Sequence, residues 1–236
     1  MVISPESTVA DIATQAPATI AIFQRHQIDF CCGGRQPLGT VCAERGINAD
    51  LLVTELVAAA TPANAEPTWA DATLTALVGH IQQRYHAHLR QELPRLAAMV
   101  DKVVSRHGDH LPDVLPPLQE TFAALTEELL THMEKEDRVL FPFIVGLDQG
   151  RPVTPETAEW IAAPISVMEA EHESAGAALA TMRQLTDDYT PPEWACPTFR
   201  GLYFGLSQFE TDMHLHVHLE NHILFPRAAQ LAARRA

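Results

Sequence analysis

The segment HMEKEDRVLFP at residues 132–142 returns as HVHLENHILFP at residues 216–226. Both copies read His-x-x-x-Glu-x-x-[Val/Ile]-Leu-Phe-Pro. One His-x-x-x-Glu match carries little weight in a chain with 12 histidines, because about one or two matches would arise by chance. The shared ending in a common register removes that explanation and indicates a duplicated helical unit. We expect the two Leu-Phe-Pro endings to pack the ends of their helices.

The spacing within each copy has a direct structural consequence. Residues four apart on an α-helix lie above one another on the same face. His132 and Glu136 therefore point together into a bundle, as do His216 and Glu220. A carboxylate can bridge two cations, whereas a neutral imidazole gives one nitrogen to one cation, and this mixed set of donors suits iron.

Two further histidines complete the expected set of ligands. His86 precedes His132 by 46 positions, and His172 precedes His216 by 44. Helical hairpins of nearly equal length bring their ligands to one level of a bundle. We therefore predict four terminal histidines, two per iron, and two bridging glutamates: His86, His132, His172, His216, Glu136 and Glu220.

The expected cofactor is a pair of non-haem iron ions with an oxo or hydroxo bridge. Each ion then has two nitrogens, two carboxylate oxygens and one bridging oxygen, which leaves a sixth octahedral position for a small diatomic or oxygen-derived ligand. A ferritin-like site is the alternative. It needs Glu-x-x-His on two helices, and here only Glu169-x-x-His172 fits, so it is disfavoured.

The chain as a whole favours an all-α fold. It is 47% hydrophobic but only 6% aromatic, and it has no alternating β-branched runs. Proline- and glycine-containing loops separate four long helical segments, expected at 70–107, 116–146, 155–188 and 196–232. Short loops make successive helices antiparallel, so residues 70–236 are predicted to form an up-down-up-down four-helix bundle. A small helical domain is expected at 1–60 and a linker at 61–69.

Charge and apolar patterning exclude several classes of partner. Thirty acidic and 16 basic residues give a net charge of −14, which repels nucleic acid and anionic membranes. No basic stretch followed by an apolar one begins the chain, and no apolar run is long enough for a bilayer. We expect a cytoplasmic protein. Four cysteines are too few for a disulfide framework. The sequence leaves the oligomeric state open, a homodimer included.

These residues resemble a known family, the hemerythrin-like di-iron proteins for repair of iron centres (RIC proteins), found in bacteria under nitrosative and oxidative stress. The resemblance covers nearly the whole chain. It rests on the following segments: Asp29-Phe-Cys-Cys-Gly-Gly34, Arg84-Tyr85-His86, His132 to Pro142, Pro164 to Glu169 with Glu171-His172, and Leu219-Glu220 through Ala228.

The resemblance implies a short domain with a vicinal cysteine pair joined to a bundle with a di-iron site. The six ligands predicted above match those of the family. Members are linked to repair of damaged iron–sulfur clusters, and reactions with nitric oxide are attributed to them, so damaged iron–sulfur proteins are the expected partners. The additional His214, His218 and His222 depart from the family pattern and leave the surroundings of the ligands open.

The vicinal pair Cys31-Cys32 is the expected catalytic element outside the iron site. A thiolate is both a nucleophile and a soft ligand, so the pair suits redox chemistry or transient transfer of iron or thiol. The structural alternative is a turn with one cysteine packed inside. In either case we expect Gly33 and Gly34 to supply backbone freedom.

Other histidines on the same segments are expected near the site or at the surface. His88 and His218 each lie two residues from a predicted ligand, roughly 200° around the helix, and should face away from the metal. Glu169 and Glu171 are expected near His172.

The leading functional hypothesis is repair of damaged iron–sulfur clusters by iron donation, nitric oxide reduction or both. The alternative is a carrier or sensor of oxygen or nitric oxide without turnover. A simple carrier has no need of thiols, so Cys31 and Cys32 discriminate between these hypotheses. No phosphate-binding loop or nucleophile elbow occurs in the sequence. Whether the protein is an enzyme is left open.

Overall fold

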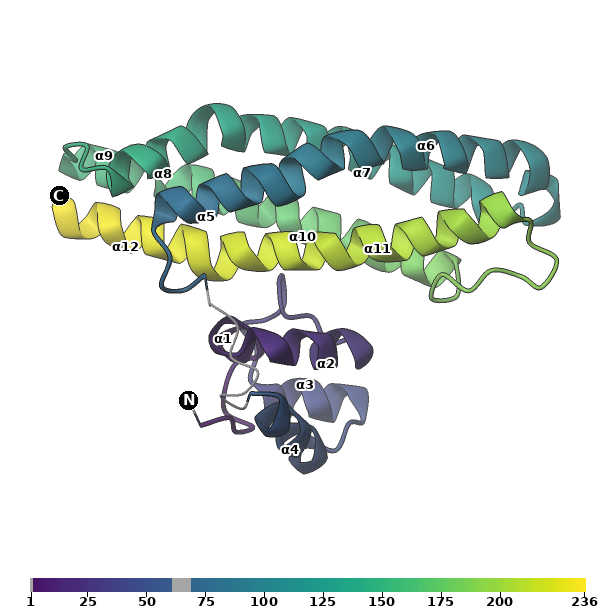
Figure 1. Ribbon diagram of the computed structural model, residues 1–236, viewed down its shortest axis with the longest axis horizontal. Helices are drawn as coiled ribbons and strands as arrows, with labels where there is room; N and C mark the ends of the chain where they lie inside the picture. The colour runs from purple at the N-terminus through teal and green to yellow at the C-terminus, as the bar shows by residue number, and fades with distance from the viewer. Residues whose placement is uncertain (1, 61–68) are drawn as a thin grey trace.

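The computed structural model describes residues 2–60 and 69–236, and in these ranges it is built of helices. Figure 1 shows a long antiparallel bundle with a smaller helical domain beneath it. The all-α fold is therefore confirmed. Apart from Trp69, the linker expected at 61–69 lies outside the described residues. None of the described helices is long and apolar enough to cross a membrane.

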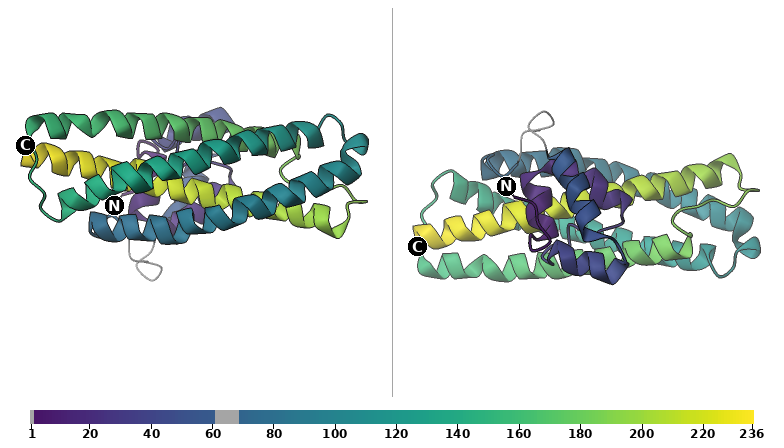
Figure 2. Two further views of the ribbon diagram at one scale, coloured as in Figure 1. Left: turned by 90° about the horizontal axis from the view of Figure 1, so that it is seen from above. Right: turned by 90° about the horizontal axis from the view of Figure 1, so that it is seen from below.

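Four helical rods form the bundle, and Figure 2 shows them side by side. The first hairpin contains α5 (Leu74–Ile81) with α6 (Ala87–His107), then α7 (Leu115–Lys135) with α8 (Phe141–Asp148). The second hairpin contains α9 (Pro155–Trp160) and α10 (Ala162–Leu185), then α11 (Pro197–Leu219) with α12 (Phe225–Arg235). Each helical segment predicted from the sequence thus corresponds to one rod.

Three of these rods contain a π-helical turn in the described residues. The turns span Gln82–His86, Glu136–Leu140 and Glu220–Leu224, and each joins two α-helices into one rod. The Leu-Phe-Pro endings lie at the last two of these turns, inside the rods. The prediction that they pack helix ends is therefore wrong.

Proline supplies a physical reason for two of the turns. Pro142 and Pro226 follow directly in the first turn of α8 and α12, and neither has an N–H to donate to the carbonyl four residues back. The ladder instead bonds Phe141 N–H to the Glu136 carbonyl and Phe225 N–H to the Glu220 carbonyl. The turn at Gln82–His86 has no following proline, and the sequence gives no signal for it.

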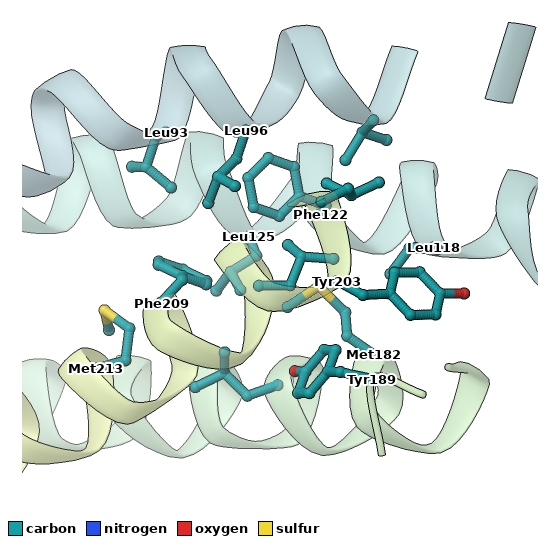
Figure 3. Close-up of a cluster of buried hydrophobic side chains, with 14 of the residues drawn as sticks. Leu93, Leu96, Leu118, Phe122, Leu125, Met182, Tyr189, Tyr203, Phe209 and Met213 are labelled. Atoms are coloured by element: carbon teal, nitrogen blue, oxygen red, sulfur yellow. The ribbon is translucent and has the colours of Figure 1, made fainter. Parts of the chain in front are cut away.

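Two separate apolar clusters fill the bundle. One, shown in Figure 3, includes Leu96, Phe122 and Phe209 and occupies the half near α6 and the start of α11. The other includes Ile81, Phe141 and Phe225 and occupies the opposite half of the bundle, which contains α5, α8 and α12. The polar side chains described below lie between the two clusters, where water is excluded.

The N-terminal domain has its own core. It contains α1 (Val9–Gln15), α2 (Ile20–Arg25), α3 (Leu38–Arg45) and α4 (Ala49–Ala59). Asn48 caps α4 by accepting a hydrogen bond from Leu51 N–H at 3.1 Å. The core includes Phe23, Phe30 and Leu38, and Leu215 of α11 packs against it. The domain therefore rests directly on the bundle (Figures 1 and 2).

Candidate metal centre

All six side chains predicted as ligands meet in one buried layer of the bundle. His86 ends the first π-helical turn, His132 and His216 lie near the ends of α7 and α11, and His172 lies on α10. Glu136 and Glu220 begin the other two π-helical turns. The two glutamates are 0% exposed and the histidines at most 3%.

These six residues form two groups that share both glutamates. His86 and His216 belong to one group, and His132 and His172 belong to the other; Glu136 and Glu220 belong to both. Within each group the candidate ligand atoms lie within 4.8 Å of one another. We call these the 86/216 group and the 132/172 group. Each takes one histidine from each hairpin.

The carboxylates stand between the two groups. One oxygen of Glu220 is 2.9 Å from Nε2 of His216, and its other oxygen is 3.1 Å from Nε2 of His172. Oε2 of Glu136 lies 3.4 Å from Nε2 of His86 and 3.3 Å from Nε2 of His132. Neither oxygen of Glu136 makes a hydrogen bond of good geometry within the described residues, although both are buried acceptors.

Three of the four imidazoles are oriented by an oxygen acceptor. Nδ1 of His86 donates to Asp137 at 3.0 Å, Nδ1 of His132 donates to Glu171 at 2.8 Å, and Nδ1 of His172 donates to Asn221 at 2.8 Å. Such partners fix the tautomer and direct Nε2 toward a metal. The sequence prediction placed Glu171 near its neighbour His172, whereas it contacts His132.

His216 is the exception. Its Nδ1 has no hydrogen-bond partner among the described residues, and its ring stacks on Tyr85 with 5.2 Å between centroids and an 8° interplanar angle. Tyr85 precedes His86 in the sequence as Glu171 precedes His172. In the pseudo-symmetric arrangement, a tyrosine ring therefore stands beside His216 where a carboxylate stands beside His132.

The arrangement of nitrogens fits a bound cation. In a neutral imidazole that donates through Nδ1, Nε2 carries a lone pair. The Nε2 atoms of His132 and His172 are 3.0 Å apart, and those of His86 and His216 are 3.1 Å apart. Two adjacent ligands about 2.1 Å from an octahedral ion would be separated by about 3 Å. These donors therefore match the spacing of ligands around one metal ion.

The electrostatics of the layer also favour positive charge. Burial by itself would lower the pKa of His86, but the hydrogen bond to Asp137 and the nearby carboxylates of Glu136 and Glu220 raise it to about 11. In His132 the charge of Glu136 opposes burial and raises the pKa to about 9. Burial prevails in His216, whose pKa is lowered. The neighbouring imidazoles hold the pKa of Glu220 well below its usual value against the effect of burial.

Aromatic rings pack on the imidazoles. Phe141 stacks on His86 with 5.4 Å between centroids, and Phe225 stacks on His172 with 6.1 Å between centroids. Both phenylalanines come from the Leu-Phe-Pro endings. These endings therefore help to position two candidate ligands, a role that the sequence analysis did not assign to them.

The cysteine pair lies in a turn organised by Asp29. Its carboxylate accepts hydrogen bonds from the N–H groups of Cys31, Cys32 and Gly33 at 2.8, 3.0 and 2.8 Å. Cys31 is 2% exposed and its Sγ is 3.7 Å from that of Cys32, which is half-buried. The pKa of Cys31 is raised well above its usual value by the hydrogen bond between the two thiols, by burial and by the negative charge of Asp29.

This turn docks on the bundle beside the candidate metal layer. The Cys32 thiol donates to the backbone carbonyl of His172 at 3.4 Å. Nε2 of His222 donates to the Cys31 carbonyl at 2.6 Å, and Nδ1 of His218 donates to the Phe30 carbonyl at 3.0 Å. His218 does face away from the candidate metal ligands, as predicted, but it is buried in the interdomain contact. The structure thus connects the thiol pair to the bundle.

The turn ends in Gly34 because there is no room for a side chain at this position, and not because its φ is positive. Among the described residues the only glycines with positive φ are Gly46 and Gly150, so the expected backbone freedom at Gly33 and Gly34 is wrong. A Cβ on Gly34 would lie 2.5 Å from the Phe30 carbonyl oxygen.

Replacing Gly34 with alanine is therefore expected to displace the cysteine turn. We expect a loss of about 1–3 kcal/mol in unfolding free energy, measured by urea denaturation, and faster alkylation of Cys31. Gly79→Ala is the matched control, because its Cβ would meet nothing within 4 Å. Equal stability and alkylation in the two variants would contradict the steric argument.

The sequence analysis missed the acceptors Asp137 and Asn221. A signal for them was present, because each directly follows the glutamate of its repeat, and each holds the first histidine of its own hairpin. Aligning the two copies residue by residue marks this position as a paired polar site. The contact from Glu171 to His132 crosses between hairpins and has no local signal.

Comparison with known proteins agrees with this geometry. Residues 78–228 match the family described as Hemerythrin HHE cation binding domain, and residues 5–60 match a Domain of Unknown function (DUF542). The iron-sulfur cluster repair protein YtfE of Yersinia pseudotuberculosis serotype O:1b (strain IP 31758) is 41% identical over 217 residues, which cover 92% of this chain and 94% of the relative. The protein of the same name from Yersinia pestis (strain Pestoides F) is 40% identical with the same coverage. The chain therefore belongs to the hemerythrin HHE cation-binding family, together with these YtfE proteins.

Proposed function

We propose that the six-residue layer holds two non-haem iron ions, one in the 86/216 group and one in the 132/172 group, with Glu136 and Glu220 bridging them. The observation that carries this proposal is that both glutamates belong to both groups. Imidazole nitrogens and carboxylate oxygens form a donor set suited to iron. A pair of iron ions, when bound, would supply one- and two-electron redox chemistry and a site for small ligands.

We further propose that the protein repairs iron–sulfur clusters damaged by nitrosative or oxidative stress, in a reducing cytoplasm. Support comes from its relatives named as iron-sulfur cluster repair proteins, which align over 92% of this chain. Damaged iron–sulfur proteins are the proposed partners, and iron donation and nitric oxide reduction are the two proposed routes. The proposal also includes a homodimer, which a measurement of molar mass in solution would test.

The residues of the chain have distinct tasks in this proposal. Asp137, Glu171 and Asn221 hold three imidazoles with Nε2 directed into the layer. The two apolar clusters exclude water on either side. A cavity of about 410 Å³ between the N-terminal domain and α11 is lined by Tyr85, Leu215 and Ile223. Its mainly apolar wall suits a small uncharged ligand such as nitric oxide.

The cysteine pair favours repair over simple carriage. Cys32 contacts the backbone of His172, and Cys31 is held by His222, two residues from Glu220. A carrier that only binds a gas has no use for two thiols so close to its ligands. We propose that the pair serves redox or transfer chemistry linked to the iron site.

An anaerobic experiment tests the proposal. The reduced, iron-loaded protein is given nitric oxide with and without a damaged-cluster client, while nitrous oxide, protein-bound iron and client activity are followed. We expect either catalytic nitrous oxide formation or stoichiometric iron loss with client recovery. Reversible binding of nitric oxide without either result would contradict the repair function and support the carrier or sensor alternative.

A further inference from the structure

Four aromatic rings form a continuous series of contacts from the edge of the bundle to a candidate metal ligand. Trp69 stacks on His80 with 4.2 Å between centroids and a 27° interplanar angle. His80 meets Tyr85 edge-on with 5.7 Å between centroids, and Tyr85 stacks on His216 with 5.2 Å between centroids. Such distances are typical of aromatic rings in direct contact. Trp69, His80 and Tyr85, which we call the aromatic relay, therefore lead to the 86/216 group.

The outer end of the relay is accessible and is held in place. Trp69 and His80 are half-buried, whereas Tyr85 is 7% exposed and His216 is 1% exposed. Arg227 of α12 donates to the backbone carbonyl of Trp69 at 3.1 Å. Exposure thus decreases along the series from Trp69 to the candidate ligand.

The relay reaches one of the two ligand groups. Tyr85 stands beside His216 where a carboxylate stands beside His132. The rings stacked on His86 and His172 include phenylalanines, which give up an electron less readily than a phenol or an indole. The readily oxidised ring that stacks on a candidate ligand, among the residues that the structure describes, is therefore Tyr85.

We propose that the aromatic relay carries electrons from Trp69 to the metal layer, so that oxidising equivalents formed there are discharged at the surface instead of damaging the ligands. This inference rests on the proposed function, because the layer needs a redox-active metal to take up an electron. Electronic coupling falls steeply with distance, and rings in contact keep each step short. Burial and the charge of Arg84 lower the pKa of His80, so this ring is neutral at pH 7 and does not oppose the removal of an electron from its neighbours.

The reaction balances with hydrogen peroxide as the oxidant. The Trp69 indole gives up two electrons, one at a time, and they pass through His80 and Tyr85 to the metal layer. Reduction of hydrogen peroxide to two water molecules consumes these electrons and two protons, and breaks the O–O bond. One water molecule adds to the oxidised indole, which releases two protons. In sum, one indole C–H and one hydrogen peroxide become one indole C–OH and one water molecule.

The test uses the full chain, loaded with iron and treated anaerobically with a limiting amount of hydrogen peroxide. Peptide mapping then measures the oxygen gained by each of the three tryptophans. Trp160 and Trp194 are 44% and 52% exposed, and within the described residues no series of ring contacts joins either one to a candidate ligand. An oxidant acting from solution should modify these two first, whereas the relay directs oxidation to Trp69. Metal-free protein should show no preference for Trp69.

Two variants interrupt the relay at different rings. Tyr85→Phe keeps the packing of the ring but removes its readily oxidised phenol, and His80→Leu removes the ring that joins Trp69 to Tyr85. Both variants should retain iron and lose most of the oxidation of Trp69. Tyr203→Phe is the matched control, because Tyr203 is a buried tyrosine that packs on Phe199 in the other apolar cluster. It should leave the oxidation of Trp69 unchanged.

Iron measured on the same samples separates this inference from the proposed function. Oxidation of Trp69 that persists in both Tyr85→Phe and His80→Leu would indicate a diffusing oxidant and overturn the relay. Iron-loaded protein in which Trp160 and Trp194 are modified in preference to Trp69 would overturn it as well, while leaving the iron site in place. A chain that binds no iron would contradict the proposed function and the relay together.

Discussion

Replacing Glu136 or Glu220 with glutamine is expected to remove most of the iron from both metal positions. Glutamine keeps the size of the side chain but is neutral and offers one oxygen in place of two. Each glutamate belongs to both ligand groups and lies between imidazoles of the two groups. We therefore expect iron affinity to fall by more than the roughly 10-fold to 100-fold that removing an outer partner of a ligand typically costs. Iron per chain after purification with ample supply is the measurement.

Two matched variants make this result specific. Glu134 lies on the same rod as Glu136 but is exposed and pairs with Arg138, so Glu134→Gln should keep full iron content. His132→Gln should weaken mainly the 132/172 position, because His132 belongs to one group only. Full retention of iron in both Glu136→Gln and Glu220→Gln would contradict the bridging role.

The metal-free protein is expected to lose stability as the pH rises from 7 to 9. The pKa values of His86 and His132 are about 11 and about 9 in the folded protein, above the ordinary histidine value of about 6.5. Their stabilising effect is therefore complete below about pH 6.5 and is lost as the pH rises through the folded values. We expect the unfolding free energy to fall by on the order of 3 kcal/mol over this window.

Urea denaturation of the metal-free protein at a series of pH values measures this effect. Iron-loaded protein should show a much flatter dependence between pH 7 and 9, because Nε2 of each histidine then binds metal and has no proton to lose. Replacing His86 with glutamine should reduce the slope, whereas the same change at His88, whose side chain is 47% exposed, should not. A stability that rises with pH in the metal-free protein would contradict the electrostatic interpretation.

The sequence was most informative where a single helix carries the chemistry. His132 and Glu136 are four residues apart in one chain segment, and helix geometry alone brings them together. His86 and His172 were found through the near-equal lengths of the two hairpins. The rods themselves follow from apolar periodicity and from clear proline and glycine punctuation, so the fold class was also predictable.

The remaining features depend on interactions that no local pattern encodes. The π-helical turn at Gln82–His86 has no proline beside it. The hydrogen bond from His132 to Glu171 links two hairpins, and the burial of His218 requires the N-terminal domain to dock on α11. At Gly34 the sequence suggested unusual torsion angles, whereas the structure shows a close approach to a carbonyl.

Each candidate metal position takes one histidine from each hairpin. A single hairpin carries only half of each ligand group, so two identical hairpin chains would have to associate about a twofold axis to complete both. Identity of the two chains would then make both metal positions equivalent. Fusion into one polypeptide lifts that constraint: Glu171 stands beside His132 and Tyr85 stands beside His216. If the layer holds two iron ions as proposed, these unequal surroundings would bind one ion more weakly than the other, and the protein would release that ion first while the second keeps the layer intact.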